Sequence, residues 1–184
     1  MKPLFSIIIA TYDRVDYLRG LLAGIAAHFG KLDMSHEVIV ANNARDERVA
    51  GEIAKLTEEF RNSQRVAYRH VREPLSGKCR AQNAALRAAE GAVMVFFDDD
   101  IEVTPEWLPI AAEFFQRGEF DAMQGPILIP PEMEHDEKLL RAQKRFRRIN
   151  FVKYEPGMKE IRTLTGANMA VRREVFERIG GFNE

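Results

Sequence analysis

Three consecutive aspartates, Asp98, Asp99 and Asp100, have the most specific chemistry in this sequence. They directly follow five apolar residues, 93–97, which are typical of a buried strand. Adjacent carboxylates repel one another by roughly 1 to 4 kcal/mol per pair at about 4 Å, so their placement here favours a bound cation. Mg²⁺ or Mn²⁺ suits such oxygens and takes its other ligands from phosphates and water. Asp98 and Asp100 lie on alternate sides of the chain, so Asp98 is predicted to contact a bound ligand and Asp100 the metal, and a solvated acidic turn is the alternative.

A second candidate site is the segment Gly77-Lys78-Cys79-Arg80 at the predicted start of a helix. A glycine lets the backbone approach a ligand, and the free N–H groups of a helix N-terminus favour anions. Lys78 or Arg80 would add positive charge against a diphosphate. The alternative is a glycine turn with exposed basic residues, and we interpret Cys79 as a small packing residue.

Two polar turns follow predicted strands, Thr11-Tyr12-Asp13-Arg14 and Asn42-Asn43. In a parallel sheet both turns open onto the same edge as the aspartates. An aromatic ring with neighbouring amides is suited to holding a nucleobase there. The alternative is that Tyr12 packs and that Asn42 and Asn43 only form the turn.

Other kinds of site and partner are not supported by the sequence. The four histidines show no zinc spacing, and neither a P-loop nor a G-x-G-x-x-G fingerprint is present. The net charge of −1 argues against a nucleic-acid partner. One cysteine excludes an internal disulfide and fits a reducing, cytoplasmic location. No apolar run approaches the roughly 20 residues of a transmembrane helix.

Strands and helices alternate four times in the predicted order. Strands are expected at 5–10, 37–41, 66–71 and 92–97, each followed by a helix with one apolar stripe. Asp13 is expected to cap the first helix and Gly30 to end it, Gly91 to end the third, and Pro105 to open the fourth. This pattern predicts an α/β fold with a mostly parallel, Rossmann-like sheet flanked by helices. We expect one domain over residues 1–184.

The alternation stops after Asp121. Gly-Pro and Pro-Pro pairs precede a charged segment, Glu132–Lys153, which we interpret as an insertion with a half-apolar helical stripe. Its basic part, Lys138–Lys153, is a candidate for peripheral membrane contact, with a solvated helical face as the alternative. A last strand is expected at 163–171, and a short helix is expected to end at Gly180-Gly181.

Taken together and in order, six segments resemble the inverting GT-A glycosyltransferases often called family two. The segments are Ser6–Arg14, Glu37–Asn43, Gly77–Asn83, Phe96–Leu108, Thr165–Met169 and Gly180–Glu184. The resemblance covers nearly the whole chain. It implies a GT-A fold and the transfer of a sugar from a nucleoside diphosphate sugar to a hydroxyl of a glycan or a lipid-linked acceptor.

The resemblance also implies roles for individual residues. The metal, Mn²⁺ or Mg²⁺, would be held by Asp98 and Asp100, and the wall near sugar and acceptor would be formed by Gly166, Ala167 and Asn168. The donor-binding set would be Thr11, Tyr12, Asp13, Arg14, Asn42, Asn43, Lys78, Asp98 and Asp99. In the family the second turn usually carries an aspartate that contacts the base, whereas Asn42 stands here. An amide both donates and accepts hydrogen bonds, so a different base preference is expected.

The family usually places its general base in an acidic pair a short way beyond the segment matched by Gly180–Glu184. Because the sequence ends at Glu184, we expect a C-terminally truncated chain that binds donor better than it turns over. Two other functions remain open: a nucleotide-sugar-binding module without turnover, and a nucleotidyltransferase that uses the same sheet and metal. Oligomeric state is not predicted.

Overall fold

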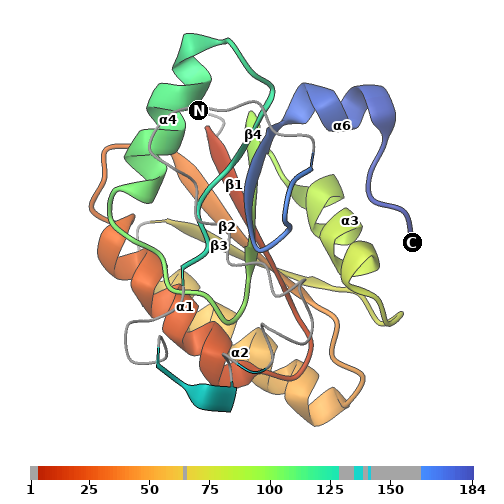
Figure 1. Ribbon diagram of the computed structural model, residues 1–184. Helices are drawn as coiled ribbons and strands as arrows, with labels where there is room; N and C mark the ends of the chain where they lie inside the picture. The colour runs from red at the N-terminus through yellow and green to blue at the C-terminus, as the bar shows by residue number, and fades with distance from the viewer. Residues whose placement is uncertain (1–3, 64–65, 129–134, 139–140, 142–162) are drawn as a thin grey trace.

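A mixed β-sheet runs through the centre of the protein (Figure 1). The computed structural model describes residues 4–63, 66–128, 135–138, 141 and 163–184. Within them the sheet has six strands in the order β3-β2-β1-β4-β6-β5, and β1 to β4 run parallel. β6 is antiparallel to both β4 and β5. The strands are β1 (Phe5–Thr11), β2 (His36–Asn42), β3 (Ala67–Arg72), β4 (Val93–Asp98), β5 (Ala122–Gln124) and β6 (Asn168–Arg172).

Helices cover both faces of the sheet (Figure 1). Apolar side chains of α1, α2 and α4 pack against one face, and those of α3 and α6 pack against the other. The helices are α1 (Val15–His28), α2 (Glu47–Ser63), α3 (Lys78–Ala88), α4 (Trp107–Arg117) and α6 (Arg173–Ile179). This layering confirms the predicted α/β class with a mostly parallel sheet.

The core explains why the central strands are continuous apolar runs. Side chains of β1 and β2 point into both helical layers, so almost every position is buried. On α1, Leu18, Leu21, Leu22 and Ile25 form the predicted stripe and all are buried. Each such side chain contributes about 1.5 to 3 kcal/mol when fully buried.

Several predicted helix ends were wrong. α1 starts after Arg14 without a side-chain cap, so Asp13 is not its cap. The helix ends at His28 with Phe29 as its C-cap, and Gly30 follows directly, as predicted. α3 ends at Ala88, because Ala89 turns to an extended conformation. Gly91 serves another purpose, since a Cβ there would lie 2.6 Å from the backbone nitrogen of Ser6.

The later part of the chain also differs from expectation. Pro105 lies in a turn, and α4 begins two residues later at Trp107. The last strand covers only Asn168–Arg172, because the preceding residues turn back at the end of β4. Most of the predicted insertion Glu132–Lys153, with its basic stretch, lies outside the described residues. No helix in the described part of the chain is long and apolar enough to cross a bilayer.

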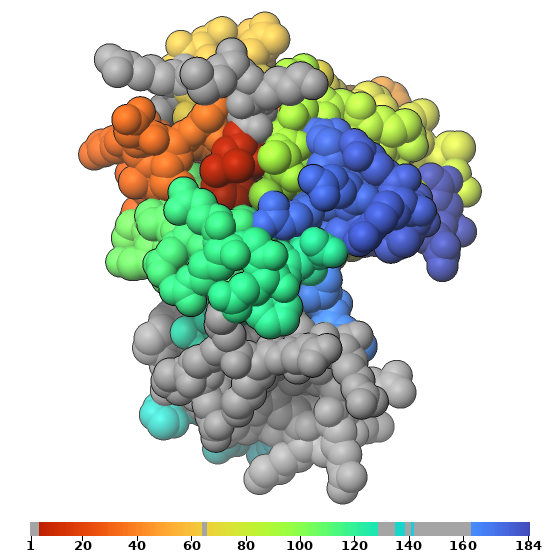
Figure 2. Space-filling view, turned by 90° about the horizontal axis from the view of Figure 1, so that it is seen from above, coloured from red at the N-terminus to blue at the C-terminus, as the bar shows by residue number. Residues whose placement is uncertain are grey.

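The two ends of the sheet differ in what surrounds them. Figure 2 shows the amino end, where the start of β1, in red, is bordered by α4 in green and the segment around α6 in blue. At the opposite end, β1, β2 and β4 finish in the polar turns singled out from the sequence. That opposite end is called the carboxyl end below.

Candidate functional site

The carboxyl end of the sheet brings most of the predicted site residues together. Parallel pairing sets Thr11 beside Asn42 and Ala10 beside Asp98. The antiparallel β6 starts at the same end, and the backbone N–H of Asp98 donates to the carbonyl of Ala167 at 3.4 Å. Turns far apart in sequence thus meet around the three aspartates.

Asp99 is the inward-facing member of the acidic turn, with 1% of its side chain exposed. Its Oδ2 accepts a hydrogen bond of 2.7 Å from the hydroxyl of Thr11, and its Oδ1 forms an ion pair with Arg14. Burial raises the pKa of Asp99 above its usual range, and the contacts from Thr11 and Arg14 only partly oppose this. Asp99 therefore anchors the turn to β1 and α1.

Asp98 and Asp100 face outward, with 27% and 39% of their side chains exposed. Asp98 forms an ion pair with Lys78, and Asp100 pairs with Arg14 at 2.5 Å. Partial burial lowers the pKa of Arg14, but the charges of Asp99 and Asp100 outweigh it and hold that pKa above its ordinary value. Two cations thus face three carboxylates, which leaves a net charge of −1 at the turn.

These carboxylates suit a divalent metal only as part of a shared site. Among the described residues no group of three or more His, Cys, Asp or Glu side chains converges as a metal cage. Asp98 and Asp100 offer two partly exposed carboxylates. Mg²⁺ or Mn²⁺ commonly takes one or two carboxylates and completes its coordination shell with phosphate and water. The donor set fits a metal that arrives with a phosphate ligand.

Lys78 stands at the first position of α3, facing this acidic turn. The preceding Gly77 has φ of +148°, a conformation that side-chain-bearing residues rarely adopt. A Cβ built on Gly166 would lie 3.9 Å from Lys78 Nζ, so the loop before β6 borders the ammonium. The helix start, the aspartates and this loop therefore lie next to one another, and the helix start brings N–H groups and an ammonium that favour an anion.

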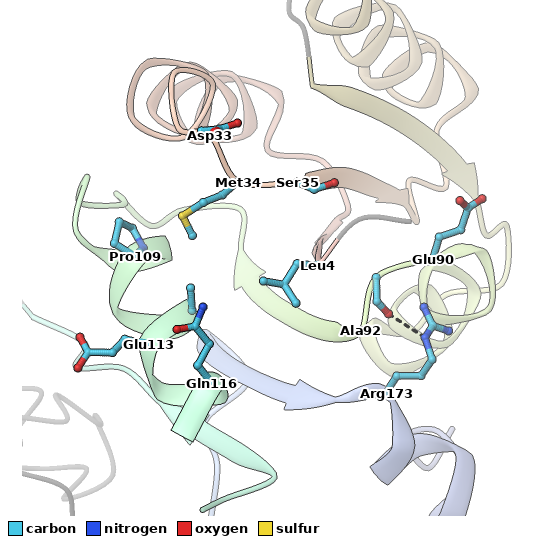
Figure 3. A pocket seen from close by; sticks show the side chains of 12 residues that line it. Leu4, Asp33, Met34, Ser35, Glu90, Ala92, Pro109, Glu113, Gln116 and Arg173 are labelled. Atoms are coloured by element: carbon cyan, nitrogen blue, oxygen red, sulfur yellow. Dashed lines mark hydrogen bonds between the residues drawn. The ribbon is translucent and has the colours of Figure 1, made fainter. Parts of the chain in front are cut away.

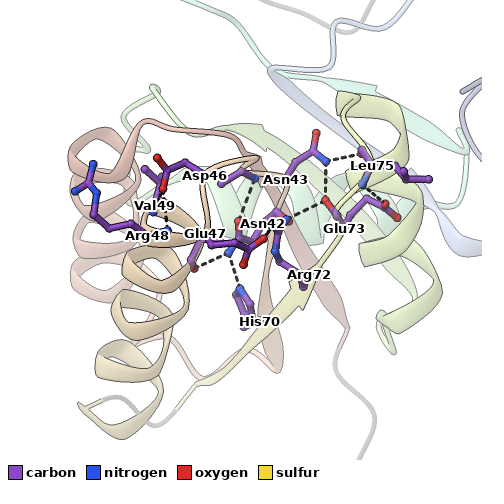
Figure 4. A network of polar contacts seen from close by, with 12 residues as sticks. Asn42, Asn43, Asp46, Glu47, Arg48, Val49, His70, Arg72, Glu73 and Leu75 are labelled. Atoms are coloured by element: carbon purple, nitrogen blue, oxygen red, sulfur yellow. Dashed lines mark hydrogen bonds and ion pairs between the residues drawn. The ribbon is translucent and has the colours of Figure 1, made fainter.

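Asn42 does not present its amide to solvent, as Figure 4 shows. Its Nδ2 donates to the carbonyl of Ala50 and to His70 Nε2, and its Oδ1 accepts from the backbone N–H of Ala44. All polar atoms of the fully buried side chain are engaged. The contact with His70 could not be predicted from the sequence, because the two residues are brought together by the pairing of β2 with β3.

Asn43 fixes the loop that leads into α3 (Figure 4). Its Nδ2 donates to the carbonyls of Glu73 and Leu75, and its Oδ1 accepts from the N–H of Gly77 at 2.8 Å. The side chain predicted to meet a base instead positions the backbone in front of Lys78. A sequence pattern could not distinguish these roles, since both use a buried amide after a strand.

The predicted wall at 166–168 also contains both a buried structural residue and residues that are partly exposed. Asn168 is buried, donates to the carbonyl of Pro126 and accepts from the indole N–H of Trp107 at 2.7 Å. Its amide therefore holds the loop in place. Gly166 and Ala167 are partly exposed beside Asp98, while Tyr12, 40% exposed, and Asp13 project from the first turn.

Two cavities of the described residues lie away from the acidic turn. One of about 860 Å³ lies at the amino end, between Leu4, Met34, Pro109 and Arg173 (Figure 3). Another, of about 630 Å³, lies between α1 and α2 and reaches the acidic turn only through Asp13 and Arg14. Neither cavity is lined by Asp98, Asp99 or Asp100.

Comparison with known proteins gives one family. The profile described as glycosyl transferase family 2 matches residues 6–180. The poly(ribitol-phosphate) β-N-acetylglucosaminyltransferase TarS of Staphylococcus aureus is 28% identical over 65% of this chain and 20% of its own length. The beta-monoglucosyldiacylglycerol synthase of Trichormus variabilis is 23% identical over 99% of this chain and 38% of its own length. The chain thus spans well under half of these curated relatives.

Solved structures agree on the fold. The mannosyltransferase PcManGT from Pyrobaculum calidifontis, in complex with GDP-Man and Mn²⁺, superimposes with a TM-score of 0.67 at 23% identity, over 100% of this chain and 48% of that one. Staphylococcus aureus TarS 1–349 in complex with UDP-GlcNAc gives 0.61 at 20% identity, over 97% and 47%. The chain belongs to glycosyl transferase family 2 and has the GT-A fold.

Proposed function

We propose that this chain binds a nucleoside diphosphate sugar at the carboxyl end of its sheet, together with Mn²⁺ or Mg²⁺. The sugar would pass to a hydroxyl of a glycan or lipid-linked acceptor, with inversion at the anomeric carbon. The observation that carries the proposal is the acidic turn Asp98–Asp100 at the end of β4, facing Lys78 and the start of β6. Relatives that bind GDP-Man and UDP-GlcNAc support this donor class.

The diphosphate is assigned to the space between the acidic turn and the start of α3. The first backbone N–H groups of α3 and the ammonium of Lys78 favour an anion there. Asn43 holds that helix start in position through Gly77. The base is assigned to the first turn, where the exposed ring of Tyr12 offers a stacking surface beside Asp13.

The metal is assigned to Asp98 and Asp100. A divalent cation there supplies positive charge that stabilises the leaving nucleoside diphosphate. Asp99 is a positioning residue, because its buried carboxylate holds Thr11 and Arg14 rather than facing the site. Gly166 and Ala167 would border the sugar, since they lie beside Asp98.

A thermal-shift screen tests donor and metal binding together. UDP, GDP, dTDP and CDP are each added with and without MnCl₂. We expect one nucleotide to raise the melting temperature clearly with Mn²⁺ and weakly without it, because a bound ligand stabilises the folded state by RT ln(1 + [L]/Kd). The nucleotide that stabilises the protein also identifies the base of the donor.

Charge-neutral variants give the control. Asp98→Asn and Asp100→Asn should each abolish most of the Mn²⁺-dependent shift. Asp33→Asn removes an equal charge from an exposed position near the amino end and should leave the shift unchanged. No shift with any of the four nucleotides, or a shift that survives both site variants, would refute the proposal.

A further inference from the structure

We propose that Lys78 is a built-in counter-ion of the metal site. Without metal, the ammonium of Lys78 forms an ion pair with Asp98. A divalent cation then replaces the ammonium on Asp98, and the released ammonium pairs with the diphosphate of the donor. This inference rests on the proposed function, and it adds an ordered exchange of partners at Lys78 that makes metal and nucleotide binding depend on each other.

The first support is the position of the ion pair. Lys78 Nζ pairs with Asp98, one of the two outward-facing carboxylates, so the ammonium stands on an oxygen that the metal needs. Half of the Lys78 side chain is exposed, and exposed ion pairs hold their partners weakly. The flexible side chain can therefore leave Asp98 at small cost.

The second support is the contrast with Arg14. Its guanidinium contacts two carboxylates, and one of them is the buried Asp99. Releasing Arg14 would leave a buried charge without its cation, which is far more costly than releasing an exposed one. Arg14 therefore stays in place, and Lys78 is the cation that exchanges.

The third support is the backbone under Lys78. Asn43 ties Gly77 to the end of β2, and Gly166 borders the ammonium on the other side. The helix start is fixed while the side chain is free to swing between the acidic turn and the space before α3. Release from Asp98 therefore leaves Lys78 beside the helix start that favours phosphate.

Charge gives the exchange a direction. The three aspartates against Arg14 and Lys78 leave a net charge of −1 at the turn, which attracts a cation. A divalent ion changes this to +1, which attracts a diphosphate. Metal must improve nucleotide binding by the same factor as nucleotide improves metal binding. Lys78 would contribute to that factor in two ways, by competing with the metal for Asp98 and by pairing with the diphosphate once the metal is bound.

The test measures Mn²⁺ binding by the loss of the free-ion electron paramagnetic resonance signal as MnCl₂ is titrated into protein without nucleotide. We expect Lys78→Gln to bind Mn²⁺ about two- to fivefold more tightly than the wild type, the value of an exposed ion pair. UDP or GDP in the presence of Mn²⁺ should bind Lys78→Gln more weakly, so the coupling factor falls.

Two matched variants separate the exchange from a general effect of charge. Lys78→Arg keeps the positive charge and should bind Mn²⁺ alone as weakly as the wild type. Lys31→Gln removes an exposed positive charge before β2, near the amino end, and should also match the wild type. Circular dichroism and melting temperature verify that every variant is folded.

The outcomes distinguish the two proposals. If the wild type binds Mn²⁺ with nucleotide but Lys78→Gln binds Mn²⁺ alone no more tightly, the counter-ion role is wrong and the donor site stands. If Lys31→Gln shows the same gain as Lys78→Gln, net charge explains it and the counter-ion role is again wrong. If no protein binds Mn²⁺ with any nucleotide, the metal part of the proposed function fails as well.

Discussion

Each end of the sheet buries one carboxylate, but the two are treated in different ways. At the amino end Glu37, 3% exposed, accepts hydrogen bonds from the hydroxyl of Ser6 at 2.6 Å and the N–H of Glu90 at 2.7 Å. Arg69 adds a third contact at 3.1 Å. At the carboxyl end Asp99 is as deeply buried, yet stands in a row of three carboxylates. At the amino end one buried carboxylate is met by three donors, whereas at the carboxyl end three adjacent carboxylates face two cations.

The contrast indicates what each end is for. The Glu37 network also includes the N–H of Gly91, which donates to Ser6 Oγ, so four chain segments are joined around one carboxylate. The Glu37 carboxylate itself is buried and is used up by these internal contacts. The carboxyl end keeps Asp98 and Asp100 partly exposed, and the cation on Asp98 is the half-exposed Lys78. We infer that the amino end stabilises the fold and that the carboxyl end is arranged for recognition.

Glu37→Ala should produce the largest loss of stability. Removing the carboxylate leaves two donors, the Ser6 hydroxyl and the Glu90 N–H, without their acceptor, at about 1 to 3 kcal/mol each. Urea unfolding followed by circular dichroism measures the free energy. Glu37→Gln keeps an acceptor for Ser6 and Glu90 and should lose less. Equal losses for the two variants would mean that packing, and not the charge network, stabilises this end.

Thr11→Val should have an intermediate effect. It removes the hydroxyl that donates to the buried Asp99, and leaving a buried acceptor without its donor costs about 1 to 3 kcal/mol. Thr11→Ser retains the hydroxyl and is the matched control. If Thr11→Val unfolds at the same urea concentration as Thr11→Ser, Asp99 is not the structural member of the acidic turn.

Much of this fold could be predicted because its signals are local. The burial of β1, β2 and β4 is predicted by their continuous apolar runs, and the burial of one face of α1 is predicted by its apolar stripe. Helix ends were less predictable because tertiary contacts decide them. Gly91 was expected to end α3, yet its small size serves the close approach to Ser6 on β1, which the local sequence does not reveal.

The candidate site was predictable in place but not in orientation. The parallel-sheet rule located the aspartates and the two turns at one edge, and the structure brings them together there. Which side chains face inward depends on contacts between distant segments. Asn42 meets His70, Asn43 meets Gly77 and Asn168 meets Trp107, and none of these pairs has a recognisable spacing.

His36 at the amino end should make stability depend on pH. The side chain is buried and Nδ1 contacts the carbonyl of Met34, while Nε2 is buried without a hydrogen bond. Burial lowers the pKa of His36, so the folded state favours the neutral ring. Stability is therefore fully present above the unfolded-state pKa of about 6.5 and is lost as the pH falls through it toward the lower folded-state pKa.

The measurement compares urea unfolding at pH 7.5 and pH 5.0. His36→Asn, whose amide can donate to the same carbonyl, should lose less stability on acidification than the wild type. His70 also has a pKa lowered by burial and by Arg72, but it is present in both proteins and cancels in the comparison. An identical loss in both proteins would show that His36 takes no part in the pH dependence.

Asp98→Asn should have the smallest effect on stability, within about 0.5 kcal/mol of the wild type. The variant removes an exposed ion pair with Lys78, which is worth little, and it also relieves repulsion from Asp99 and Asp100. Its Mn²⁺-dependent shift with nucleotide should nevertheless be lost. Asp98 would then be needed for ligand binding but not for stability, whereas Glu37 is needed for stability. A loss of several kcal/mol in the free energy of unfolding of Asp98→Asn would remove this distinction between the two ends.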